Sequence, residues 1–149
     1  MSRRAFTLVE LVLVIGIIAI AAAIAIPRYA DALLRYRADA AARRISGDLA
    51  LARSRANTTS TAHSVVFSVA ANEYRIPEMA DASTGAAYTV RLGDAPYRAT
   101  LVSASFGGQS QVSFNGYGVP NCGGALLIRA GSVERTVVLD ATSGRASVQ

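Results

Sequence analysis

The residue with the clearest chemical task in this sequence is Glu10, because it is a carboxylate inside a strongly apolar segment. Residues 11–26 carry no charge. A carboxylate within a membrane helix costs about 2.5–3.5 kcal/mol at mid-bilayer, so it persists where it has a partner or a task. No cation lies at helical spacing within the apolar run. We therefore expect the partner of Glu10 to come from outside this helix, or the site to lie near the membrane interface.

Residue types suited to catalysis or metal binding are few. The chain has one histidine, His63, and one cysteine, Cys122, which excludes a His/Cys metal cluster, a Cys-x-x-Cys motif and an internal disulfide. We expect Cys122 to be a half-buried thiol, with an intermolecular bridge as the alternative. Gly107-Gly108 and Gly123-Gly124 indicate turns and not a phosphate-binding loop. Since a pair of catalytic carboxylates is also missing, the sequence predicts a protein that is not an enzyme and holds no cofactor or metal.

The apolar segment from Phe6 to Ile26 is long enough to cross a membrane as a helix. At about 1.5 Å per residue, its roughly 21 residues extend about 31 Å, close to the hydrocarbon thickness of a bilayer. Arg3 and Arg4 precede the segment and favour a cytoplasmic N-terminus by the positive-inside rule. Three arginines between positions 28 and 37 weaken that preference.

The helical pattern continues beyond Pro27, where we expect a kink or one loosened turn. In residues 27–57, apolar positions recur at spacings of three and four, and alanine, the best helix former, is abundant. This stripe consists of Leu34, Ala38, Ala41, Ile45, Leu49, Ala52 and Ala56. We expect a helix from Phe6 to about Ala56, with a second half that a sheet covers. A simple membrane anchor with a helical stalk is the alternative.

From about Ala62 the apolar period changes to two, and turn signals separate eight short runs. The expected strands are Ser64–Val69, Glu73–Ile76, Ala87–Leu92, Tyr97–Val102, Gln111–Phe114, Ala125–Ala130, Arg135–Leu139 and Arg145–Val148. The sequence therefore predicts an α+β fold, in which a long N-terminal helix packs on an antiparallel β-sheet head formed by residues 62–149. We expect one or two sheets over the helix stripe.

The segment Ala5-Phe6-Thr7-Leu8-Val9-Glu10-Leu11 resembles the class III signal peptide of type IV pilins and pseudopilins. The resemblance implies cleavage between Ala5 and Phe6 and N-methylation of Phe6 by a prepilin peptidase/N-methyltransferase. It also implies a role for Glu10 in filament assembly. Cleavage would give Phe6 a new α-ammonium group, and the Phe6 of a staggered neighbouring subunit could then pair with Glu10. The family normally has Gly before the cut, so Ala5 implies slower processing.

This resemblance implies a pilin-like organisation. Residues 1–5 would be a leader peptide, 6–26 the transmembrane half of the helix, 27–57 its amphipathic periplasmic half, and 62–149 the β-rich head. The chain would be a single-pass protein of the inner membrane, with its N-terminus cytoplasmic before processing and its head in the periplasm. Its expected partners are other pilins or pseudopilins in a filament and the lipid of the inner membrane.

Two other export signals fit part of the N-terminus. A conventional secretory signal would use small-residue cleavage sites within residues 21–25, and Ser2-Arg3-Arg4-Ala5-Phe6 resembles a twin-arginine signal. Either would release a soluble periplasmic protein. Glu10 interrupts the apolar core that such signals need, and the helical pattern continues past Pro27, so both are the weaker interpretation.

Three segments of the remaining chain narrow the resemblance to the GspH/FimT group of minor pseudopilins and minor pilins. Ile45–Ala56 is similar to their helix segment, Val112–Gly118 to their Phe-Asn-x-x-Gly element, and Leu139–Ala146 to their terminal Gly-Arg strand. The resemblance implies a minor pseudopilin of a type II secretion system, the H-type subunit of a periplasmic pseudopilus for protein export. The alternative is a FimT-like minor pilin that assists assembly of a type IV pilus.

A pilin that binds DNA during uptake is a further interpretation. Some FimT-like proteins use a Gly-Arg-x-Arg element for DNA, but Gly144-Arg145-Ala146-Ser147 lacks the second Arg. Arg129, Arg135 and Arg145 could form a small basic face only if their strands are neighbours, and so few charges would bind phosphate weakly. We expect instead a solvated charged edge that discourages strand pairing, and no nucleic-acid partner.

Overall fold

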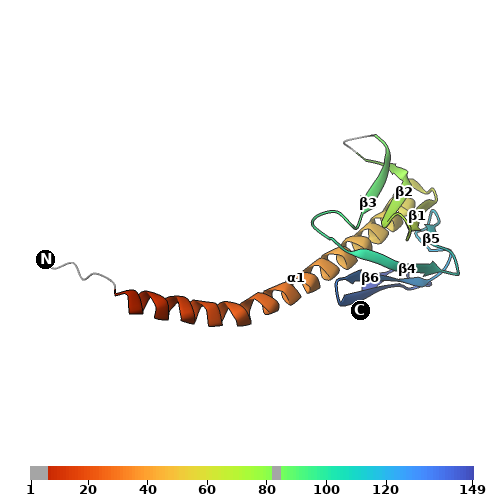
Figure 1. Ribbon diagram of the computed structural model, residues 1–149. Coiled ribbons are helices and arrows are strands. Elements are labelled where there is room, and N and C mark those ends of the chain that lie inside the picture. Colours follow the sequence, from red (N-terminus) through yellow and green to blue (C-terminus); the bar gives the residue numbers. More distant parts are fainter. Residues whose placement is uncertain (1–6, 82–84) are drawn as a thin grey trace. The chain divides into compact units, whose positions relative to one another are not determined.

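One helix opens the described chain, and eight β-strands follow it (Figure 1). The computed structural model describes residues 7–81 and 85–149. The elements are α1 (Leu8–Thr59), β1 (His63–Ser68), β2 (Glu73–Ala80), β3 (Ala87–Arg91), β4 (Thr100–Phe106), β5 (Gln111–Phe114), β6 (Gly124–Ala130), β7 (Val133–Leu139) and β8 (Ala146–Val148). The chain divides into two compact units, Met1–Leu33 and Leu34–Gln149.

The first unit contains the apolar part of α1. Its large aliphatic side chains are exposed, with Leu8 at 78 % and Ile26 at 67 %. By length and composition this helix can cross a membrane, and none of its most apolar window is buried within the protein. Pro27 lies inside α1 and does not end it. The kink expected at Pro27 stays a prediction, and the expected first helical residue, Phe6, lies outside the described residues.

The part of α1 in the second unit buries one face, as the stripe predicts. Its buried residues are Ala38, Ala41, Ala42, Ile45, Asp48, Leu49, Ala52 and Ala56. Most of these side chains are a single methyl group, which allows strands to approach the helix backbone closely. The stripe is therefore confirmed from Ala38 onward, Leu34 is half-buried, and the acidic Asp48 is an unexpected member.

Helix α1 ends at Thr59, slightly later than the sequence pattern indicates. The hydroxyl groups of Thr58 and Thr59 donate to the carbonyl oxygens of Ser54 and Arg55, each at 2.8 Å. These bonds to the preceding turn keep both threonines in helical geometry. Ser60 then has a positive φ of 52°, the left-handed conformation that commonly ends helices.

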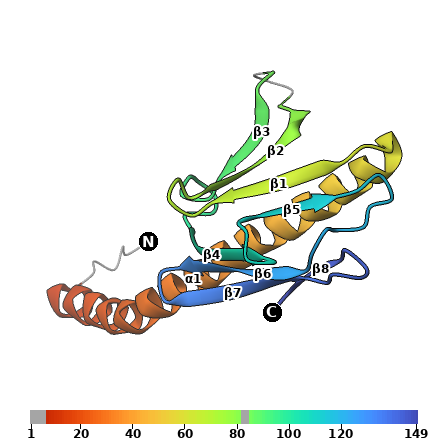
Figure 2. The ribbon, with the colours of Figure 1, turned by 90° about the vertical axis from the view of Figure 1, so that its right-hand side faces the viewer.

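Two four-stranded antiparallel sheets form the rest of the second unit (Figure 2). One has the strand order β3-β2-β1-β5 and the other β4-β6-β7-β8. Each of the eight expected strands is present, and six begin and end within two residues of the expected positions. Buried residues alternate with half-buried ones along β1, and with half-buried or exposed ones in β6, which is the pattern of strands with one face on a core. The α+β prediction is thus confirmed.

Strands β2 and β4 differ most from the expectation. β2 continues through Pro77 to Ala80, with an irregular register between Ile76 and Ala80 that accommodates a residue without an N–H group. β4 begins at Thr100 and not at Tyr97, because Arg98 has a positive φ of 44°. The side chain of Asn72 fixes this segment, since its amide donates to Ala99 O at 2.9 Å and its oxygen accepts from Leu101 N at 2.8 Å.

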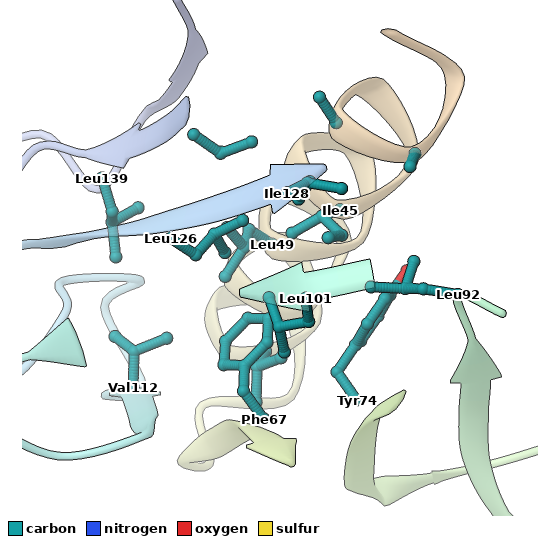
Figure 3. Packing of buried hydrophobic residues seen from close by; sticks show 14 of the residues in the cluster. Ile45, Leu49, Phe67, Tyr74, Leu92, Leu101, Val112, Leu126, Ile128 and Leu139 are labelled. Atoms are coloured by element: carbon teal, nitrogen blue, oxygen red, sulfur yellow. The ribbon is translucent and has the colours of Figure 1, made fainter. Parts of the chain in front are cut away.

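The core of the second unit lies between the helix stripe and the two sheets (Figure 3). Ile45 and Leu49 of α1 lie beside Leu126 and Ile128 of β6 in this view. The ring of Phe67 stacks on Phe106 with centroids 5.4 Å apart. These buried residues form a hydrophobic core within the second unit. Burying one aliphatic side chain fully stabilises a fold by about 1.5–3 kcal/mol.

Candidate assembly site

The candidate site begins at the first turn of α1, where Thr7 caps the helix. Its side-chain oxygen accepts a hydrogen bond from Glu10 N at 3.2 Å, and its carbonyl accepts one from Leu11 N at 3.2 Å. A Thr at the cap with a Glu three residues later is the sequence signature of a capping box. That signature was readable in Thr7-Leu8-Val9-Glu10, and it places Glu10 in the first turn, where a negative charge also favours the positive end of the helix dipole.

Glu10 is exposed and is surrounded along α1 by exposed aliphatic side chains. Within residues 7–81 and 85–149, it has no ion-pair partner. The expected partner outside this helix stays a prediction. The predicted cleavage and methylation residues, Ala5 and Phe6, lie outside the described residues, so their roles stay predictions.

Asp48 is a buried charged residue that the sequence does not single out. It lies on the stripe of α1 and is only 6 % exposed. Its Oδ2 accepts hydrogen bonds from Tyr74 Oη at 2.5 Å, Tyr88 Oη at 3.0 Å and Arg44 Nε at 3.1 Å. Because these tyrosines belong to β2 and β3, the contacts fasten that side of the sheet to the helix. We call these four side chains the Asp48 cluster.

The protonation states of Tyr74, Tyr88 and Arg44 favour their hydrogen bonds to Asp48. Burial and the nearby charge of Asp48 raise the pKa of Tyr74 and of Tyr88, so both phenols remain protonated donors at neutral pH. Burial alone would lower the pKa of Arg44, but the charge of Asp48 and the interactions with Tyr88 together outweigh burial and raise that pKa. Arg44 also donates to Tyr88 Oη, and its guanidinium carbon lies 5.9 Å from the Tyr88 ring centroid. Each of the four side chains is bound to another member of the cluster, so the contacts explain it as a structural link between helix and sheet.

Comparison with known protein families shows to which family the chain belongs. The family model described as "Type II transport protein GspH" matches residues 41–143, which is more than half of the chain. The chain belongs to the GspH family. A model of the prokaryotic N-terminal methylation motif also matches residues 1–26.

A solved structure shows the same fold. The type IV minor pilin FimU of Pseudomonas aeruginosa superposes with a TM-score of 0.56 at 19 % identity, over 77 % of this chain and 90 % of FimU. No curated protein matches the chain. With the methylation motif, the GspH family identifies the chain as a prepilin-like minor pilin or minor pseudopilin, a class of structural subunits. Membership implies anchoring by the apolar helix, processing by a prepilin peptidase and assembly with other pilins.

The GspH-like motifs of the head have a physical explanation in the turn after β5. The Asn115 side chain accepts hydrogen bonds from Tyr117 N and Val119 N, both at 3.0 Å, and so builds the turn. Gly116 packs so closely on the end of α1 that a Cβ would lie 2.7 Å from Ser60 O. Gly118 has a positive φ of 73°, and its carbonyl accepts from Arg53 Nε at 3.3 Å. The Phe-Asn-x-x-Gly element is therefore a turn fastened to the helix.

The Gly-Arg element packs against that same turn. Gly144 has a positive φ of 63°, and a Cβ there would lie 3.2 Å from Gly118 O and 3.4 Å from Arg53 Cδ. Three segments that are separate in the sequence thus meet at one end of the second unit, where Figure 2 shows the β5–β6 and β7–β8 connections beside the end of α1. This packing gives the order of the three segments in this chain a structural reason.

The three arginines considered for nucleic acid do not form one face. β6 and β7 are neighbours, but Arg129 lies opposite Glu134 in the register and Arg135 lies opposite Ile128, so the two arginines lie on opposite faces of the sheet. Arg129 pairs with Glu134 at 2.6 Å, and Arg135 pairs with Asp39 of α1 at 2.5 Å. Arg145 lies in the turn before β8. This geometry removes the shared basic face on which the DNA interpretation depended.

His63 and Cys122, the single histidine and cysteine, do not form a chemical site among the described residues. His63 begins β1 and is buried, and its Nδ1 lies 3.3 Å from Thr61 O. Cys122 is free and half-buried, as expected. Within the described ranges, no group of three His, Cys, Asp or Glu side chains is placed to hold a metal ion.

Proposed function

We propose that this chain is the H-type minor pseudopilin of a type II secretion system, a structural subunit of a periplasmic pseudopilus for protein export. The description of the matching family, a type II transport protein, favours this system. The second candidate is a FimT-like minor pilin of a type IV pilus, which the fold shared with the minor pilin FimU favours. Both use the same helix and the same processing.

The observation that carries the proposal is Glu10, a carboxylate that has no ion-pair partner within residues 7–81 and 85–149 and lies in a helix whose large aliphatic side chains are exposed. After cleavage between Ala5 and Phe6, the chain would begin with an α-ammonium that methylation leaves charged. The Phe6 ammonium of one subunit would then meet Glu10 of the next. A buried pair of opposite charges costs desolvation but specifies stagger, because any other register leaves two unpaired charges. Neighbouring helices would cover the aliphatic side chains.

A location in the cell is part of the same proposal. The apolar half of α1 would remain in the inner membrane before assembly, with the head in the periplasm. The prepilin peptidase/N-methyltransferase would act at Ala5 and Phe6, and the other partners would be pilins or pseudopilins and membrane lipid. Pro27 would loosen one turn at the edge of the membrane segment.

The test is the variant Glu10→Ala in the native host. We expect normal processing but strongly reduced incorporation into purified filaments, because removing one member of a buried ion pair costs about 3–5 kcal/mol. Asp31→Ala, which removes an exposed carboxylate from the same helix, is the matched control. Normal incorporation of Glu10→Ala would contradict the proposal.

The choice between the two filament systems needs a separate experiment. Deletion of the gene should abolish export of folded periplasmic cargo and leave surface pili intact if the chain serves type II secretion. Loss of pili with normal export would favour the type IV pilus.

A further inference from the structure

The turn after β5 presents an exposed aromatic side chain on a rigid support. Tyr117 is 86 % exposed, the highest value among the large hydrophobic side chains of the described residues. Asn115 N donates to Val119 O at 2.9 Å and Gly118 N donates to Asn115 O at 2.8 Å, in addition to the two bonds to the Asn115 side chain. These bonds fix the backbone that carries Tyr117, so binding has to order only the two side-chain torsions of the tyrosine, a low entropy cost that is typical of interface anchors.

Two arginines beside this turn have unused donors. Arg53 uses only its Nε, toward Gly118 O, and Arg145 follows Gly144, which packs on that same carbonyl. Among the described residues neither arginine has a carboxylate partner. In the head, Arg91, Arg129 and Arg135 are paired, whereas Arg75 and Arg98 also lack a carboxylate partner among the described residues. Arg53 and Arg145 differ from these two in their place at the turn that carries Tyr117. Arginine and tyrosine are the residue types enriched at binding hot spots, and a guanidinium binds carboxylates through two parallel hydrogen bonds.

The charge of the turn before β8 indicates which kind of partner fits. The Asp140 carboxylate is exposed and accepts hydrogen bonds from Ser143 N at 2.6 Å and Thr142 N at 3.1 Å. Those bonds lower the pKa of Asp140, so it stays negative beside Arg145. The phosphates of a nucleic-acid backbone would be attracted by the two arginines but repelled by the carboxylate of Asp140. A protein surface with one or two carboxylates can engage the arginines and avoid Asp140.

We propose that Tyr117, Val119, Arg53 and Arg145 form a docking surface for the head of a neighbouring pilin-class subunit that presents carboxylates around an open slot. We call these four residues the motif-turn surface. The inference rests on the proposed function, since it assumes a filament. It adds a second contact to the helix packing and gives the two head motifs a binding role besides their structural one.

The head itself shows that this fold can present such a slot. A cleft of about 490 Å³ lies along β2 and β3, and its lining includes Glu73, Asp94, Thr89 and Arg91. Within this lining Glu73 pairs with Arg91 at 3.5 Å, whereas Asp94 has no ion-pair partner among the described residues. The motif-turn surface and this cleft lie on different elements, so a contact between two such surfaces is heterologous, the head-to-tail type from which an open filament can be built.

The first test is photocross-linking in the native host with the full-length chain. A photoreactive amino acid at Tyr117 should form an adduct with another pilin-class subunit, and the attachment peptide should come from its head and contain Asp or Glu. The same probe at Gln109, an exposed turn residue between β4 and β5, is the matched control and should give at least about tenfold less adduct. Adducts only with nucleic acid, or equal adducts at both positions, would overturn the inference.

The second test uses surface variants that leave the fold unchanged. Tyr117→Ala and Arg145→Glu should each reduce copurification with the cross-linked subunit about tenfold, whereas Arg75→Glu, the same charge change on β2, should not. If both variants copurify fully, the inference is wrong. The proposed function then still stands, provided that Glu10→Ala shows the expected loss of incorporation into filaments. A wild-type chain absent from filaments would overturn both.

Discussion

Two carboxylates on the same helix, Glu10 and Asp48, avoid the cost of burial in different ways. Asp48 has three donors from its own chain and lies in a finished hydrophobic core. Glu10 has no charged partner in the part of the chain that the structure describes. A residue that is satisfied internally stabilises the subunit, whereas one that lacks a partner is available for assembly. This contrast separates folding from function at the level of single residues.

Glycine substitutions test the motif turn. Gly116→Ala should destabilise the protein by about 1–3 kcal/mol, because its Cβ would lie 2.7 Å from a backbone oxygen that cannot move easily. Gly47→Ala is the matched control, since Gly47 is an exposed residue inside α1 with open space around its Cβ position. It should stabilise the protein by about 0.5–1 kcal/mol. Chemical denaturation of the detergent-solubilised chain measures both, and equal effects would refute the close-packing argument.

At the residue scale, the sequence predicts positions whose signal is local. Glu10 stands out because its neighbours are apolar, and the stripe is visible because its spacing is regular. Asp48 has no such signal, because its partners Tyr74 and Tyr88 lie 26 and 40 residues away in the sequence. An aspartate within a helical stripe is ordinarily solvated, and only the fold shows that two phenols approach it.

At the scale of elements, the Asp48 cluster joins β2 and β3 to α1. Asp48→Ala should destabilise the protein by about 3–5 kcal/mol, because it leaves Arg44 and two phenols without their acceptor. Asp39→Ala is the control, since the Asp39–Arg135 pair is solvent-accessible and worth about 0–1 kcal/mol. Urea unfolding of both variants measures the difference. Similar values would show that the cluster does not fasten the sheet.

The cluster should also make the head sensitive to alkali. Burial holds the pKa of Tyr74 above its ordinary value of 10.0, whereas the unfolded chain ionises near that value. The stabilisation is therefore complete below about pH 10 and is lost as the pH rises further. Thermal melting between pH 8 and 11 should show a falling Tm above about pH 10, with a shallower fall for Tyr74→Phe. An identical fall in both proteins would assign the effect to other groups.

The ends of helices and strands are predictable from the sequence where contacts between residues close in the sequence determine them. The two-residue alternation identified β5 with its ends, because its turns are marked by Gly and Asn. β4 was misplaced because the side chain of Asn72, from another turn, determines where pairing starts. Helix α1 ends later than expected for a local reason. The hydroxyls of Thr58 and Thr59 bond to the preceding turn, and this effect is harder to read from the sequence than the run of polar residues that predicts the helix end.

At the scale of the whole molecule, the two units differ in whether they can bury their apolar surface. The unit Leu34–Gln149 has its own core. The large aliphatic side chains from Leu8 to Ile26 are exposed in the single chain, so lipid or other helices must cover them. The sequence predicts this requirement from length and composition, but it cannot name the covering partners, because their residues belong to other chains.

The central claim is that trimming the leader supplies the positive charge that Glu10 needs. Mass spectrometry of the N-terminal peptide of the native protein tests it most directly. We predict a mature chain that begins at Phe6 and carries one methyl group on its α-amine. A chain that retains residues 1–5, or a soluble product that begins near Ile26, would contradict the claim.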